Sequence, residues 1–152
     1  MGAPPEDSPI PPVIRIVLDT NLLISAALPG SRLLPIVSAW KEGPCRLLVS
    51  EDIFDEYLQV LSYPKFQLAP ETIRRLIEHE LRPYVELIHV TSRIHVITAD
   101  PSDDKFLACA LDGHADAIVS GDRHLLGLKE FNGISILTGR QLLDRLEIGD
   151  SH

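Results

Sequence analysis

Residues 13–28 read VIRIVLDTNLLISAAL, and this stretch decides the fold. Its first six residues form an apolar run, interrupted only by Arg15, that is typical of a strand buried on both faces of a parallel sheet. The polar residues DTN at 19–21 favour strand ends and helix caps. A helical pattern then extends over residues 22–28 and stops at a Pro-Gly pair. The stretch therefore predicts a strand, an acidic turn and a helix, in that order.

The alternation of strand and helix patterns continues along the rest of the chain. Further strands are predicted at residues 46–49, 85–90, 94–97, 117–120 and 134–137. Further helices are predicted at residues 31–43, 51–61, 70–83, 103–113 and 139–146, with Ser31, Ser50 and Thr138 as N-caps and Gly113 as a C-cap. Because no repeat or low-complexity tract interrupts this alternation, we expect an α/β fold. Its form would be a three-layer α/β/α sandwich around a mainly parallel central sheet.

Length and composition predict a single domain. With 152 residues, 45% of them hydrophobic, the chain is long enough for one core and too short for two. The proline-rich residues 1–12 predict a flexible lead-in, residues 13–147 the domain, and residues 148–152 a short tail. The sequence contains neither a secretory signal pattern nor an apolar stretch of the roughly 20 residues that span a bilayer. Cys45 and Cys109 lack metal-ligand spacing, so we expect buried thiols in a reducing, cytoplasmic setting.

The net charge is −8, with 14 Lys and Arg residues against 22 Asp and Glu residues. This balance argues against a protein held on nucleic acid by a broad basic surface. It does not exclude an enzyme whose carboxylates hold a cation, because the metal then supplies positive charge beside a phosphate. The positions of the acidic residues in the sequence must therefore decide whether the protein acts on nucleic acid.

Acidic residues stand at the expected element ends. Asp19 directly follows the first predicted strand, Asp122 follows the strand at 117–120, and Glu56 and Asp104 lie near the beginnings of predicted helices. Ligands of open parallel sheets bind beyond the carboxyl ends of the strands, so these acids could converge there. Oxygen ligands without His or Cys favour Mg²⁺ or Mn²⁺, and such a cation suits phosphodiester hydrolysis.

Each acid also has a structural explanation. Asp19 could cap the following helix, Asp103 and Asp104 could lie against a helix dipole, Glu56 could be a solvated charge, and Asp122 could be a turn residue. For any one acid alone, the structural explanation is preferred. The functional hypothesis rests on the four occurring together in order.

That order, with its flanking residues, resembles the PIN-domain nucleases, and most closely the toxin components of bacterial type II toxin–antitoxin pairs. The segments that carry the resemblance are VLDTNLLISAAL at 17–28, LLVSEDIFDEYLQVL at 47–61 and DPSDDKFLACALDGHADAIVSGD at 100–122. It extends in order from about residue 13 to residue 146, which is far more specific than a short motif.

The resemblance implies a cytoplasmic endoribonuclease of α/β/α architecture that depends on Mg²⁺ or Mn²⁺ and uses a metal-bound water. It also implies an RNA substrate, a homodimer and a cognate antitoxin protein. The implied catalytic and metal-binding acids are Asp19, Glu56, Asp104 and Asp122. The implied supporting residues are Thr20, Asn21, Asp103 and Ser120.

Three other functions fit parts of the pattern. A PIN-like domain can be a catalytically silent module that binds RNA or protein, although a degenerate site would usually have lost one of the acids. A haloacid-dehalogenase-like phosphatase would need a second Asp two residues after Asp19, and position 21 is Asn. A receiver-like signalling domain would carry its acid pair in a different order.

Overall fold

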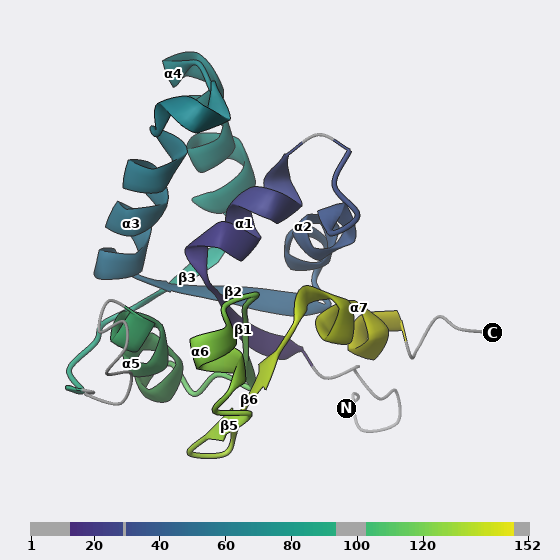
Figure 1. Ribbon diagram of the computed structural model, residues 1–152, viewed down its shortest axis with the longest axis vertical. Helices are drawn as coiled ribbons and strands as arrows, with labels where there is room; N and C mark the ends of the chain where they lie inside the picture. Colours follow the sequence, from purple (N-terminus) through teal and green to yellow (C-terminus); the bar gives the residue numbers. More distant parts are fainter. Residues whose placement is uncertain (1–12, 29, 94–102, 148–152) are drawn as a thin grey trace, which may run out of the picture.

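The computed structural model describes residues 13–28, 30–93 and 103–147 (Figure 1). Its strands form one sheet in the order β3-β2-β1-β4-β6-β5, in which all neighbouring pairs are parallel except β5 and β6. The strands are β1 (Ile14–Leu18), β2 (Cys45–Ser50), β3 (Val85–Ile88), β4 (Ala117–Val119), β5 (Glu130–Phe131) and β6 (Ile134–Leu137).

Helices cover both faces of this sheet, which confirms the predicted three-layer α/β/α sandwich. The helices are α1 (Thr20–Ala27), α2 (Leu34–Glu42), α3 (Glu51–Leu61), α4 (Pro70–Arg75), α5 (Asp104–Asp112), α6 (Arg123–Leu126) and α7 (Gly139–Glu147). Helices α1 to α4 lie on one side of the sheet and α5 lies on the other (Figure 1). None of the helices in the described part of the chain has the length and apolar character needed to span a bilayer.

The central strand β1 is buried as its composition predicts. Ile16, Val17 and Leu18 are each fully buried, so both faces of the strand are covered. From the other side, α5 packs Phe106 and Leu107 into the same core. The burial of β1 therefore fixes the position of Asp19, which follows the strand at the carboxyl edge of the sheet.

The expected caps are confirmed at Ser50 and Thr138 but not at Ser31. The Ser50 hydroxyl accepts a hydrogen bond from the backbone N–H of Ile53 at 3.2 Å. Thr138 and Gln141 exchange side chain–backbone bonds of 2.8 and 3.1 Å at the start of α7. The prediction that Ser31 caps α2 was wrong, because the helix begins at Leu34 with a proline in its first turn.

Several elements were not predicted. These are α6, the two-residue strand β5 and the 3-10 turn Pro64–Phe66. The helix predicted at 70–83 is present, but its second half, Leu76–Leu81, is π-helical, which the sequence did not predict. The predicted strand at 94–97, the lead-in 1–12 and the tail 148–152 lie outside the described residues. Cys45 and Cys109 are free and buried, as expected, and burial raises the pKa of each thiol to about 12.

Candidate active site

The candidate site lies at the point in the sheet where the order of the strands changes direction. From β1 the chain passes to β2 on one side, whereas β4 pairs with the other side of β1. Such a switch point opens a crevice between the carboxyl ends of the two strands, and ligands of α/β proteins bind there. Asp19 directly follows β1, and Asp122 lies three residues beyond the end of β4.

Asp19 is a buried carboxylate held in a fixed orientation. It is only 5% exposed. One oxygen, Oδ1, accepts the backbone N–H of Leu22 at 3.0 Å as the N-cap of α1, and Oδ2 accepts the hydroxyl of Ser120. Burial raises its pKa, the two hydrogen bonds act against that rise, and the negative charges of Asp122 and Glu56 add to it. Its role as a cap is thus confirmed, and it also shares an electrostatic environment with two other predicted acids.

Ser120 connects Asp19 to Asp122. It is fully buried, and its Oγ accepts the backbone N–H of Asp122 at 2.8 Å while donating to Asp19. Asp122 in turn caps α6, because its Oδ1 accepts the N–H of His124 at 2.7 Å. The ends of β1 and β4 are therefore joined through one serine hydroxyl.

Glu56 reaches the same region from α3. Thr20 of α1 donates its hydroxyl to Oε2 of Glu56, and the ammonium Nζ of Lys105 lies 2.5 Å from Oε1. The Glu56 side chain is 23% exposed. Glu56 therefore links α3 to α1 and to α5 through these two contacts. The interpretation of Glu56 as a solvated charge was wrong.

Tyr57 positions α3 against the end of β1. Its side chain is fully buried, and its hydroxyl donates to the carbonyl oxygen of Leu18 at 2.6 Å. Leu18 immediately precedes Asp19. This bond therefore holds the helix that carries Glu56 against the end of the strand that Asp19 follows. The sequence indicated only a core aromatic here, because a helical stripe does not reveal the partner of a hydroxyl.

The remaining predicted residues lie at the starts of two helices. Asp103 and Asp104 are at the start of α5, each 9% exposed, and Lys105 follows them. Asn21 is exposed in the first turn of α1. The charges of Glu56 and Asp122 thus both act on Asp19, and Asp104 directly precedes Lys105, the residue that contacts Glu56.

A family model described as the PIN domain matches residues 15–124, which is most of the chain. This chain belongs to the PIN-domain family. The match contains all four predicted acids. PIN domains are generally nucleases and typically use divalent metal ions. No curated protein matches the sequence.

The donor chemistry of this PIN domain suits a divalent cation. Among the described residues, no group of three His, Cys, Asp or Glu side chains is placed to hold a metal ion. Nevertheless, the buried carboxylate of Asp19 is destabilised by burial and by two neighbouring charges, and a hard cation relieves that penalty. The oxygen donors of these side chains therefore suit the chemistry of such a cation, and Glu56 would have to part from Lys105 to join them.

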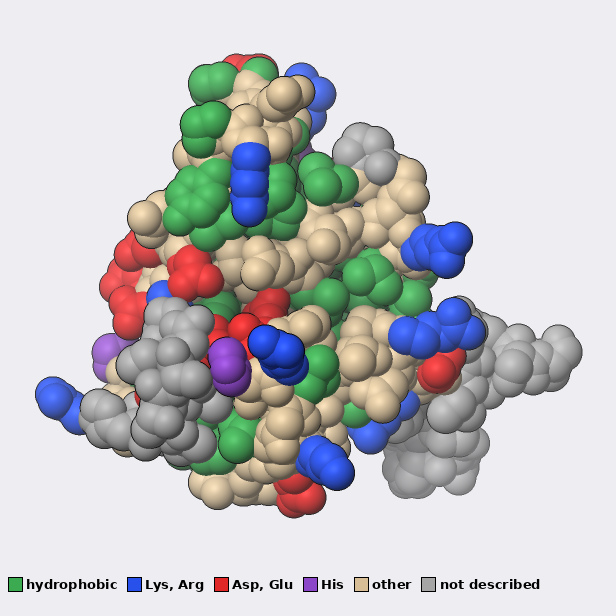
Figure 2. All heavy atoms as spheres, in the orientation of Figure 1, with side chains coloured by type: hydrophobic (Ala, Val, Ile, Leu, Met, Phe, Trp, Pro, Cys, Tyr) green, Lys and Arg blue, Asp and Glu red, His purple; other side chains and the backbone are tan. Residues whose placement is uncertain are grey.

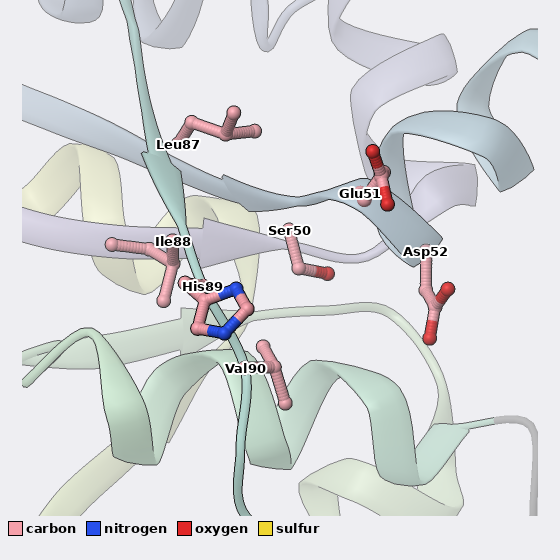
Figure 3. Close-up of a pocket in the computed structure, with 7 residues that line it drawn as sticks. All are labelled: Ser50, Glu51, Asp52, Leu87, Ile88, His89 and Val90. Atoms are coloured by element: carbon pink, nitrogen blue, oxygen red, sulfur yellow. The ribbon is translucent and has the colours of Figure 1, made fainter.

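Two adjoining hollows lie near the start of α3, and Asp104 lines one of them. One, of about 340 Å³, is lined by residues that include Ser92, Arg93, Asp104 and Lys105. The other, of about 280 Å³, lies between the end of β3 and the start of α3, with His89 on the strand side and Asp52 on the helix side (Figure 3).

Because the two hollows share Ser50, Asp52 and Val90, they form one depression that leads away from Asp104. Figure 2 shows acidic side chains gathered over the start of α3, with a His and a Lys or Arg side chain near them.

Proposed function

We propose that this PIN domain is an endoribonuclease that hydrolyses RNA phosphodiester bonds with Mg²⁺ or Mn²⁺ held by Asp19, Glu56, Asp104 and Asp122. The observation that supports the proposal is the link from Asp19 to Asp122 through the Ser120 hydroxyl at the switch point of the sheet, where the charges of Asp122 and Glu56 also act on Asp19. Like charges are gathered there at a cost to the metal-free protein, and such a cost is typical of functional sites.

The surrounding residues would orient the carboxylates. Ser120 and the N-terminus of α1 hold the two oxygens of Asp19, and Thr20 holds one oxygen of Glu56. A bound cation would supply positive charge beside the scissile phosphate and lower the pKa of a water molecule. Pre-oriented ligands keep such a cation fixed while charge develops on the phosphate. The RNA strand would lie along the depression that Asp104 lines.

The resemblance of the sequence extends the proposal to a biological role. We propose that the protein is the toxin of a type II toxin–antitoxin pair, acts in the cytoplasm as a homodimer and is inhibited by a cognate antitoxin protein. Induced expression in bacteria should then arrest growth, and Asp19→Asn should abolish the arrest. Normal growth on expression of an active nuclease would instead indicate a housekeeping enzyme.

The nuclease proposal is tested by cleavage of a mixed, structured RNA with Mg²⁺ or Mn²⁺, compared with EDTA. Asp19→Asn and Asp104→Asn should each lose activity while remaining folded. Asp144→Asn is the matched control, because Asp144 is an exposed acid on α7 paired only at the surface with Arg140, 3.2 Å away. RNA binding without cleavage under any metal would support the silent binding module instead. Cleavage that survives EDTA and both substitutions would place the activity elsewhere.

A further inference from the structure

Lys105 makes a direct contact with a residue proposed as a metal ligand. Its ammonium lies 2.5 Å from Oε1 of Glu56, and the two side chains are 26% and 23% exposed. A partly buried pair at this distance is a charge-assisted hydrogen bond, which is stronger than a bond between exposed groups. Because Thr20 takes the other oxygen, both oxygens of Glu56 are engaged.

The Lys105 ammonium provides a positive charge beside the proposed metal-binding acids in the metal-free protein. Among the ion pairs between described residues, this pair alone brings a Lys or Arg to Asp19, Glu56 or Asp122. The other carboxylates of the group repel one another, since the charges of Glu56 and Asp122 both act on Asp19. The ammonium on Glu56 offsets part of that repulsion.

We propose that Lys105 and the divalent cation exclude one another at Glu56, so that the lysine neutralises the site in the metal-free protein and is displaced when metal binds. This inference rests on the proposed function, because it requires a cation at these carboxylates. Glu56 cannot offer Oε1 to a metal while the ammonium lies against it, and two cations in that space repel each other.

A neighbouring hollow offers space for the displaced Lys105 side chain. Lys105 also lines the hollow of about 340 Å³ that contains Ser92 and Arg93. A lysine side chain has a flexible four-carbon stem, so it can swing into this hollow without movement of α5. The release of Glu56 by Lys105 therefore needs only a rotamer change of this lysine.

The test is calorimetric titration of the metal-free protein with Mn²⁺. Lys105→Met removes the charge and keeps most of the apolar stem, so the Mn²⁺ Kd should fall roughly tenfold, as expected for loss of one charge-assisted contact. Lys105→Gln is the second variant if the first does not fold, and it should also bind more tightly. Lys65→Met, which removes an exposed lysine from the turn after α3, should leave the Kd unchanged.

A second readout separates competition from a structural role. The melting temperature of the metal-free Lys105→Met protein should be lower than that of the wild type, and saturating Mn²⁺ should raise it by more. A Mn²⁺ Kd equal to or weaker than that of the wild type would overturn the inference about Lys105. If the wild type binds Mn²⁺ no better than Asp19→Asn does, the proposed function itself fails, so the two failures are distinguishable.

Discussion

The bond between Tyr57 and Leu18 is expected to stabilise the fold measurably. Tyr57→Phe keeps the ring and its packing but removes the hydroxyl that donates to the Leu18 carbonyl at 2.6 Å. The side chain is fully buried, so water cannot replace the lost donor. No cavity larger than an oxygen atom is created, which confines the effect to the hydrogen bond.

The expected cost follows from that single bond. A net hydrogen bond contributes about 1 kcal/mol, and a buried acceptor left without this donor adds to the loss, which gives about 1–2 kcal/mol in the free energy of unfolding. For a domain of about 150 residues this corresponds to a fall of about 2–8 °C in melting temperature. Cleavage activity should fall only modestly, since Tyr57 positions α3 and touches no reacting atom.

The assay is urea unfolding followed by circular dichroism, which gives both the free energy and the m-value. Tyr63→Phe is the matched control, because Tyr63 is 42% exposed and the same hydroxyl is removed there at the surface. We expect Tyr63→Phe to match the wild type and the m-values of all three proteins to agree. A Tyr57→Phe protein as stable as the wild type would refute the argument that this bond ties α3 to β1.

Two further predictions concern packing and pH. Gly113→Ala should destabilise the protein by about 1–3 kcal/mol in urea unfolding, because the new Cβ would lie 2.9 Å from the Cys109 carbonyl and 3.0 Å from the Leu48 side chain. Wild-type stability there would contradict the close packing. Asp112 accepts hydrogen bonds from Ser92 that lower its pKa, so its stabilising contribution is present above the pKa of an unfolded carboxyl and is lost as pH falls through the lower folded value. Asp112→Asn should therefore lose less stability than the wild type between pH 7 and pH 3, and equal losses would contradict this.

The fold was predictable because its main elements carry strong local signals. The apolar run before Asp19, the helical stripe after Ser50 and the cap at Thr138 each define one element with little help from the rest of the chain. The short elements had no such signal. Helix α6 and strand β5 are set by the neighbouring sheet, and the π-helical turn after α4 is a local departure that residue type does not encode.

Gly113 shows the same limit at a single residue. The pattern predicted a helix C-cap, and Gly113 does end α5, but its φ of −90° does not require glycine. The left-handed conformation falls on His114 instead, with a φ of 55°. Glycine is needed at 113 for close approach to Leu48 and Ile88, a long-range contact that local patterns do not report.

The sequence proposes the acids of the candidate site but does not give their contacts. Element ends and flanking residues pointed to Asp19 and Asp122, and the structure places both at the switch point. The engagement of Glu56 by Lys105 joins residues on different helices, as does the bond between Ser120 and Asp19 across two strands. Such pairings depend on how elements pack, so one sequence does not supply them.

The most direct test of the central claim is the location of bound metal. Paramagnetic Mn²⁺ broadens the NMR signals of nearby amides, so a titration of labelled protein with small amounts of Mn²⁺ reports where the ion lies. We predict that amides of residues 19–22 and 120–124 broaden first, and that Asp19→Asn abolishes this effect. Selective broadening around His89 and Asp52, with residues 19–22 unaffected, would contradict a metal site between β1 and β4.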